Sequence, residues 1–365
     1  MTRPVSLPAG FGRLAITAVT SVVDVVESMH ATIAAPLAAE PSPPRRARGI
    51  TRMVYATVRG VTAAVGGALD LALGALPEPR AFAESTRSTR AALNGICGDH
   101  LERTANPLAT PMALLPDPEH AASGHVLLLV HGLCLDELSW RRGDAGHGEH
   151  VARALGCSPV YVRYNTGRRI DANGAELAAA IEQFVANWPV PVERITLLGH
   201  SMGGLVLRSA CAHAEREGHG WRGRVATLVT LGTPHGGAPL ERLGQGLDRA
   251  LRATRWSAPL AAIGASRSAG ITDLRDGSVG ASDVVPSLPV GVRSHAVAAM
   301  LGTGTGRAAR LRGDGLVPLE SALGRDQRRP LGFAARDTLV VREAGHFDLL
   351  SDARVRKQLV RWLRT

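Results

Sequence analysis

The stretch that decides the fold is RITLLGHSMGG, residues 194–204. Its first five residues predict a short apolar strand, and residues 203–214 have the periodicity of a helix. Between them, GHSMG matches G-x-S-x-G, a sharp strand-to-helix turn that exposes a serine hydroxyl. Glycines are needed there because flanking side chains would clash in so tight a turn. Ser201 is therefore the predicted nucleophile; the alternative is an inert serine in a glycine-rich turn.

Apolar strands and amphipathic helices alternate around this stretch from residue 124 onward. We expect strands at 125–130, 159–162, 194–198, 225–231, 294–299 and 338–342. We expect helices at 173–188, 203–214 and 353–363. This alternation is typical of an α/β fold with a mostly parallel, doubly wound sheet.

A serine hydroxyl needs a base to become a nucleophile, and the base needs an orienting carboxylate. His346 follows the last expected strand and precedes the final helix, which makes it the predicted base. Asp314, in a Gly-Asp-Gly turn between the last two strands, is the predicted acid. Asp276 and Asp273 are alternatives, whereas Asp348 is too close to the histidine for the order Ser, acid, His. An ordinary Asp-Gly turn and a loop histidine remain the alternatives without function.

An oxyanion hole requires two backbone N–H groups aimed at the developing negative charge. Met202, directly after the serine, is predicted to supply one, and Leu133, after the first core strand, the other. Gly132 would let the backbone approach the substrate. His131, Gly132 and His235 are the substrate-binding candidates, although a bracing role for His131 and a turn-stabilising role for His235 stay open.

These motifs carry a resemblance. They are HGL at 131–133, YNTG at 164–167, GHSMGG at 199–204, LGTPHGG at 231–237, GDG at 313–315 and GHF at 345–347. The chain resembles the lipase and esterase branch of the α/β-hydrolase superfamily over residues 124–365. It is particularly similar to bacterial lipase-like proteins related to GPI inositol-deacylase. The resemblance implies hydrolysis of acyl esters without a cofactor or metal, with a lipid-like ester as the first choice of substrate.

Other functions remain open on the same scaffold. A thioesterase, an amidase or a polyester depolymerase would use the same three residues. A non-catalytic interaction module that retains the fold is a further alternative, although such a module has no need of Ser201, Asp314 and His346 in this order.

The chain divides into two expected parts. Residues 1–117 are predicted to form a helical extension, with helices at 11–33, 50–76 and 84–96, no clear strand, and a linker at 107–118. Residues 118–365 form the expected hydrolase domain, with 238–293 as a cap or lid insertion. That insertion carries an apolar stripe of leucines at positions 240, 243, 247 and 251, which could instead pack on the sheet. The extension could pack on the hydrolase, contact a membrane surface or mediate oligomerisation.

Composition excludes some partners. The net charge is +10, yet Lys357 is the only lysine among 42 basic residues, and the arginines are scattered. This pattern indicates a GC-rich genome, so we expect no nucleic-acid partner; weak attraction to an anionic membrane surface is more plausible. No secretory signal is evident, and the apolar stretches 14–23 and 60–69 look too short to span a bilayer. We therefore expect a cytoplasmic protein that contacts a membrane peripherally, if at all; its oligomeric state is not predicted.

Overall fold

The computed structural model describes residues 6–33, 49–74, 80–141, 146–239, 268–278, 287–326 and 330–364. They contain a seven-stranded sheet in the order β1-β3-β2-β4-β5-β6-β7, in which only β1 is antiparallel to its neighbour. The strands are β1 (Ala113–Pro116), β2 (His125–Val130), β3 (Ser158–Arg163), β4 (Arg194–His200), β5 (Val225–Leu231), β6 (Arg293–Met300) and β7 (Thr338–Arg342). The expected α/β fold with a mostly parallel sheet is confirmed.

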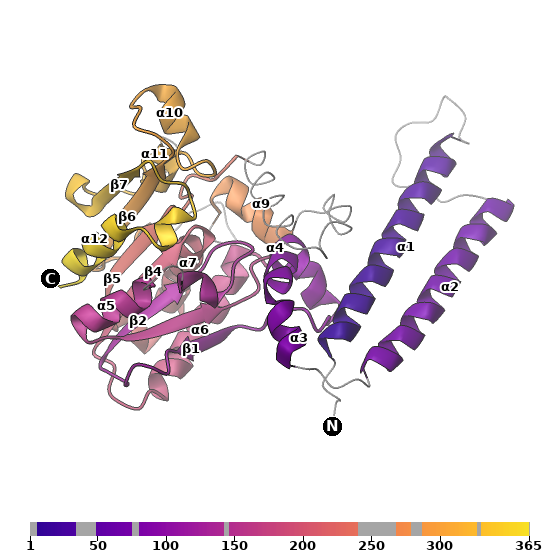
Figure 1. Ribbon diagram of the computed structural model, residues 1–365, viewed down its shortest axis with the longest axis horizontal. Helices are drawn as coiled ribbons and strands as arrows, with labels where there is room; N and C mark the ends of the chain where they lie inside the picture. Colours follow the sequence, from indigo (N-terminus) through magenta and orange to yellow (C-terminus); the bar gives the residue numbers. More distant parts are fainter. Residues whose placement is uncertain are drawn as a thin grey trace.

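Helices cover both faces of the sheet (Figure 1). Those of the hydrolase part are α5 (His147–Leu155), α6 (Ile170–Ala186), α7 (Met202–Glu217), α9 (Ala269–Asp276), α10 (Arg307–Arg312), α11 (Leu319–Ala322) and α12 (Ala353–Leu363). Short 3-10 helices are η1 (Glu137–Trp140), η2 (Gly220–Arg224), η4 (Ala335–Asp337) and η5 (Asp348–Leu350). The six expected strands and the three expected helices of this part are all present, with ends shifted by a few residues.

The core explains why β2 is a continuous apolar run. Val126, Leu128 and Val130 pack with α6 and α7 on one face. Leu127 and Leu129 pack with α5 and α12 on the other. Because parallel strands are buried on both faces, an apolar residue is favoured at every position and not at alternate ones.

Strand β1 corrects the expected organisation, since it lies inside the region predicted to be a helical extension and linker. Leu114 pairs with Val162, and Leu115 pairs with Tyr161. The linker was predicted because the segment 107–118 contains four prolines. An edge strand tolerates prolines because one of its sides makes no ladder hydrogen bonds.

The extension contains α1 (Leu7–Ile33), α2 (Gly49–Gly74), α3 (Arg80–Ser85) and α4 (Arg87–Arg103). The first two form a long antiparallel hairpin that projects away from the sheet, whereas α3 and α4 lie against the hydrolase part (Figure 1). Of the predicted insertion at 238–293, the structure describes α9 and short flanking segments; the leucine stripe lies outside the described residues.

Helix α2 also corrects an expectation about membranes. The stretch 60–69 looked too short to span a bilayer, but it is part of one continuous helix. Within that helix, Thr51–Gly74 is by length and composition apolar enough to cross a membrane, and its most apolar 18 residues include none that is buried in the protein. The sequence-based estimate counted only the uninterrupted apolar residues, whereas the helix extends past Arg59 and Asp70, whose charges are paired.

Candidate active site

Ser201 occupies the turn between β4 and α7. Its backbone has φ 53° and ψ −125°, a conformation that side-chain-bearing residues rarely adopt. Its N–H donates to the carbonyl of Leu231 at 2.8 Å, which ties the turn to β5. A Cβ on Gly199 would lie 2.6 Å from the Cα of Gly204, and one on Gly203 would lie 2.2 Å from a carbonyl oxygen of β2. The sequence therefore needs glycine here, as the motif predicted.

His346 and Asp314 are joined by two hydrogen bonds. The ring Nδ1 of His346 donates to Oδ2 of Asp314 at 2.7 Å, and the backbone N–H of His346 donates to the Asp314 carbonyl at 3.1 Å. The other carboxylate oxygen accepts from the amides of Leu316 at 2.9 Å and Val317 at 2.8 Å. This network fixes the ring orientation and places the proton on Nδ1, so that Nε2 is left as a base.

The other candidate acids are engaged elsewhere. Asp273 is buried and pairs with Arg169 at 2.9 Å. Asp276 is exposed and pairs with Arg275 at 2.6 Å. Asp348 accepts a backbone N–H within its own loop at 2.7 Å. The structure thus pairs the histidine with Asp314 and with neither of the two alternatives, Asp273 and Asp276, nor with the excluded Asp348.

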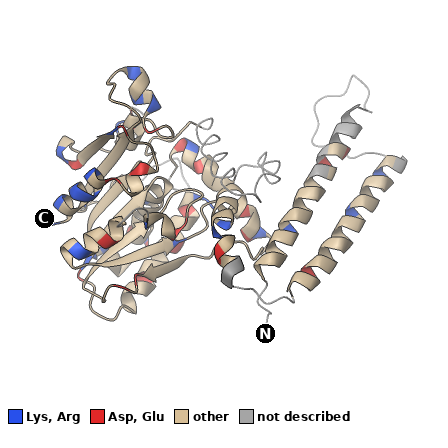
Figure 2. Cartoon of the chain, in the orientation of Figure 1, with Lys and Arg blue, Asp and Glu red and all other residues tan. Residues whose placement is uncertain are grey.

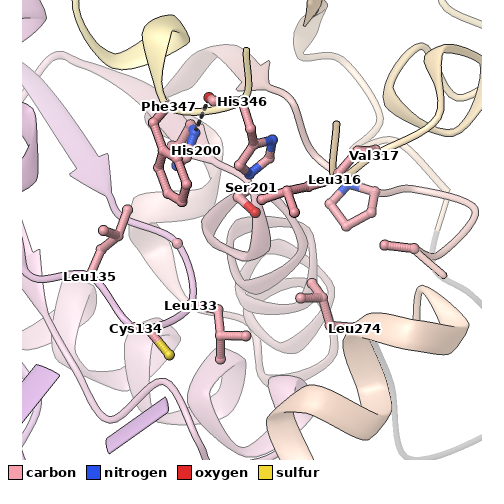
Figure 3. Close-up of a pocket in the computed structure, with 13 residues that line it drawn as sticks. Leu133, Cys134, Leu135, His200, Ser201, Leu274, Leu316, Val317, His346 and Phe347 are labelled. Atoms are coloured by element: carbon pink, nitrogen blue, oxygen red, sulfur yellow. Dashed lines mark hydrogen bonds between the residues drawn. The ribbon is translucent and has the colours of Figure 1, made fainter. Parts of the chain in front are cut away.

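Ser201 and His346 line the same cavity (Figure 3). Its volume is about 60 Å³ as bounded by the described residues, small beside the roughly 300–1,000 Å³ of common ligand pockets. Its other walls are Gly132, Leu133, Cys134, Leu135, His200, Pro234, Ala238, Leu274, Leu316, Val317 and Phe347. The lining is mostly apolar, as an acyl group requires.

The predicted oxyanion loop lies directly against the serine. A Cβ on Gly132 would lie 2.9 Å from the Cβ of Ser201, so only glycine allows this approach. Leu133 lines the cavity, and Met202 is the first residue of α7, where backbone N–H groups have no partner within the helix. Among the described residues, neither the Leu133 nor the Met202 amide has a hydrogen-bond acceptor. Both amides are therefore free to bind an oxygen atom of a ligand.

His131 does not reach the cavity, which corrects its assignment as a substrate-binding residue. It is fully buried, its Nδ1 donates to the Gly132 carbonyl at 3.0 Å, and its ring stacks on Tyr164 at 4.6 Å between centroids. The Tyr164 hydroxyl donates to the His131 carbonyl at 2.7 Å. Burial lowers the pKa of His131, so a neutral ring braces the loop.

His235 is also buried and does not line the cavity, so its assignment to substrate binding is corrected in the same way. Arg208 donates to its Nδ1 at 3.2 Å, which leaves Nε2 to donate to the Thr230 hydroxyl, also at 3.2 Å. Burial, and then the charge of Arg208, hold the pKa of His235 well below its ordinary value. The side chain stabilises the turn after β5, the alternative left open by the sequence.

His200, between the first glycine and the serine of the motif, is a positioning residue that sequence reasoning did not single out. Its Nε2 donates to the carbonyl of His346 at 3.1 Å, and the two rings lie 4.8 Å apart between centroids. The edge of Trp140 packs on His200 at 6.4 Å. The nucleophile turn therefore holds the histidine loop directly. The position of His200 next to Ser201 in the sequence was the signal that could have indicated this role.

Helix α4 also contributes to the site, although it belongs to the predicted extension. A Cβ on Gly95 would lie 2.1 Å from the Cys134 sulfur, and the Cys134 thiol donates to the Ala92 carbonyl at 3.7 Å. Asn165 donates to the Gly98 carbonyl at 2.9 Å. The oxyanion loop thus rests on α4. The small residues in the segment GICG at 95–98 were the only sequence signal for this contact.

A comparison with known protein families agrees with the resemblance drawn from the motifs. A family model described as a PGAP1-like alpha/beta domain matches residues 166–267, which include Ser201 but neither Asp314 nor His346. No curated protein matches the chain.

Three solved structures illustrate the similarity. Mature Bacillus licheniformis lipase is 21% identical, with 70% of this chain and 98% of that chain covered and a TM-score of 0.46. A thermophilic esterase from Thermogutta terrifontis is 18% identical, with 69% and 93% covered and a TM-score of 0.40. An alpha/beta hydrolase fold protein from Chitinophaga pinensis is 13% identical, with 70% and 94% covered and a TM-score of 0.43.

Proposed function

We propose that this protein is a serine hydrolase that cleaves carboxylic esters through Ser201, His346 and Asp314. One observation carries the proposal. A buried, hydrogen-bonded His346–Asp314 pair opens onto the same apolar cavity as a serine held in a strained strand-to-helix turn. Strain of this kind persists only where the surroundings enforce it, and it is concentrated at functional sites.

The proposed reaction has two halves. In the first, His346 Nε2 takes the proton of Ser201 as Oγ attacks the ester carbonyl, and the Leu133 and Met202 amides bind the tetrahedral oxyanion. The C–O bond of the ester then breaks, and His346 returns the proton to the leaving alcohol. In the second half, His346 activates a water molecule that hydrolyses the acyl-enzyme and restores Ser201. Asp314 stabilises the imidazolium that forms in both halves.

The structure records no hydrogen bond between Ser201 and His346. Such contacts are often long without substrate and tighten in the complex. Each proposed proton transfer between Ser201 and His346 therefore requires Oγ and Nε2 to come within hydrogen-bond reach when substrate is bound.

The proposed substrate is an ester with an apolar, lipid-like acyl group. Leu133, Leu274, Leu316 and Phe347 form the wall that would contact the acyl chain. The proposed chemistry uses groups of this chain alone, so we assign no cofactor, metal or nucleic-acid partner. A thioesterase, amidase or polyester depolymerase would share every step up to the leaving group.

A fluorophosphonate probe tests the nucleophile. We expect the wild type to be labelled and Ser201→Ala to be unlabelled, with Ser209→Ala, a buried serine on the same helix, as the matched control. Circular dichroism establishes that each variant is folded. A folded wild type that resists labelling would contradict the hydrolase assignment, and labelling that survives in Ser201→Ala would assign it to another serine.

A substrate panel tests the reaction class. p-Nitrophenyl esters of increasing chain length are compared with matched thioesters and anilides. We expect the esters to have the highest kcat/KM; a thioester or anilide preference of tenfold or more would replace the esterase assignment. No turnover and no labelling of folded protein would favour the non-catalytic interaction module.

A further inference from the structure

The hairpin of α1 and α2 carries most of the exposed apolar surface of the described molecule. It accounts for nine of the thirteen large apolar side chains that are exposed. These nine are Val19, Val26, Met53, Val54, Val58, Val61, Val65, Leu69 and Leu71. Soluble monomers rarely expose apolar groups in one contiguous region of this kind, and such regions mark an interaction surface.

The two helices approach each other closely at two glycines, each of which faces a large apolar side chain of the other helix. A Cβ on Gly66 would lie 3.1 Å from Ile16, and one on Gly12 would lie 3.1 Å from Leu73. The half-buried positions of α2 are 55, 59, 62, 66, 70, 73 and 74, which form a single helical stripe facing α1. The exposed valines and leucines of α2 therefore point outward. Glycines at the close contacts between helices, with large apolar residues on the outer faces, are typical of helices packed in lipid.

Five of the six charged residues in α1 and α2 pair with each other between the two helices. Arg13 contacts both carboxylate oxygens of Asp70, at 2.6 and 2.8 Å. Arg59 contacts Glu27 at 2.6 Å and Asp24 at 3.0 Å. Figure 2 shows that charged residues are sparser along α1 and α2 than along the helices of the hydrolase part. Ionisable residues inside a membrane face a neighbouring helix and are paired in this way.

The length of the hairpin fits a bilayer. At about 1.5 Å per residue, the 27 residues of α1 and the 26 of α2 extend about 40 Å, and the hydrocarbon core of a bilayer is about 30 Å thick. We propose that the α1–α2 hairpin inserts into a lipid bilayer and anchors the hydrolase part at the membrane surface. A second copy of the chain would have to cover outward faces on two separate helices, whereas lipid covers both at once.

The base of the hairpin is joined firmly to the hydrolase part. Leu7 and Leu14 of α1 pack with Leu93 and Leu101 of α4 in one buried cluster. The side chain of Asn106 donates to the backbone carbonyl at position 10, at 3.2 Å. Since α4 supports the oxyanion loop, the inserted hairpin would hold the candidate active site next to the lipid surface.

Flotation with vesicles tests the anchor. The full chain, purified in detergent, is mixed with phosphatidylcholine vesicles, the detergent is removed, and the vesicles are floated on a density gradient. We expect the wild type to float. The double variant Val61→Asp, Val65→Asp should lose at least about tenfold in bound fraction, because a carboxylate at membrane depth is costly. The matched control Val290→Asp, Leu311→Asp, at exposed apolar positions of the hydrolase part, should stay within about twofold.

Depth is read separately with Val58→Trp. We expect brominated lipids to quench the fluorescence that this tryptophan adds to the wild-type signal. Absence of quenching, or a wild type that stays at the bottom of the gradient, would overturn the proposal. A dimer that is soluble without detergent and does not float would assign the surface to a second copy. Fluorophosphonate labelling in detergent is scored independently, so a failed anchor and a failed hydrolase assignment give different results.

Discussion

Replacement of Asp314 by asparagine changes one atom at the centre of the proposed machinery. The asparagine carbonyl oxygen can keep both backbone hydrogen bonds, from Leu316 and Val317. The amide NH₂ must then face Nδ1 of His346, where the carboxylate oxygen now accepts at 2.7 Å. Two donors cannot share that contact, so the imidazole proton moves to Nε2. His346 would then donate toward Ser201 and could not accept its proton.

The expected loss in kcat is about 10⁴-fold, the size seen when a triad aspartate becomes asparagine in a serine protease. This corresponds to about 5.5 kcal/mol in transition-state free energy. An aspartate that acted only as a distant charge near the surface would contribute about 1 kcal/mol, or less than tenfold. The two explanations therefore differ by about three orders of magnitude.

The measurement is kcat on a p-nitrophenyl ester, with a thermal melt to confirm folding. Because the two backbone hydrogen bonds are kept, we expect the free energy of unfolding to fall by less than about 2 kcal/mol. Asp276→Asn, at an exposed aspartate paired with Arg275, is the matched control and should retain full activity. A folded Asp314→Asn variant whose kcat lies within tenfold of the wild-type value would refute the proposed role of Asp314. A loss of kcat in Asp276→Asn would assign that role to Asp276.

Three further predictions concern the scaffold. Gly132→Ala places a methyl group 2.9 Å from the Cβ of Ser201, so kcat should fall about 10²-fold, the loss expected when one oxyanion donor is displaced. Tyr164→Phe removes the 2.7 Å hydrogen bond to the carbonyl of His131, so the free energy of unfolding should fall by about 1–2 kcal/mol and kcat should fall more than KM changes. Burial lowers the pKa of His147 to about 4, so between pH 6.5 and 4 the unfolded chain binds a proton that the folded protein excludes. From pH 7 to 5 this difference should lower the free energy of unfolding by about 2 kcal/mol. The loss of stability over the same pH range should be smaller in His147→Gln.

Each of these has a matched control. Gly302→Ala adds a methyl group where no atom lies within 4 Å, so activity should not change. Tyr161→Phe removes a buried hydroxyl that donates to Asp117 at 3.4 Å and to no described residue of the loop at Gly132, so kcat should not change. For the third prediction, the wild type and His147→Gln are compared at both pH values. A wild type that is equally stable at pH 5 and pH 7 would contradict the account of His147. An unchanged kcat in Gly132→Ala would contradict the proposed role of the loop at Gly132.

Much of the hydrolase part could be predicted because its signals are local. A parallel strand buried on both faces must be apolar throughout, so the run at 125–130 shows in the sequence. The turn around Ser201 can also be recognised in the sequence, because its backbone leaves no room for side chains and therefore requires the neighbouring glycines. Asp314 and His346 were found by their order along the chain, which topology dictates.

What could not be predicted depends on contacts between distant residues. Strand β1 is four residues long and flanked by prolines, and only its pairing with β3 makes it a strand. His131 and His235 have the residue type of a binding group, but whether a histidine faces a cavity or a core depends on the packing around it. The contact between Gly95 and Cys134 joins helix α4 to a loop that shares no sequence pattern with it.

The packing of α4 under the oxyanion loop also determines where the chain can be cut for protein production. A fragment that begins at residue 118 would lose β1 and α4, and with them the support of Cys134 and of one edge of the sheet. A fragment that begins at Arg80 keeps both and omits the hairpin. It would expose Leu93 and Leu101, which pack against α1 in the full chain. Polar residues at these two positions would remove the apolar surface that this truncation uncovers.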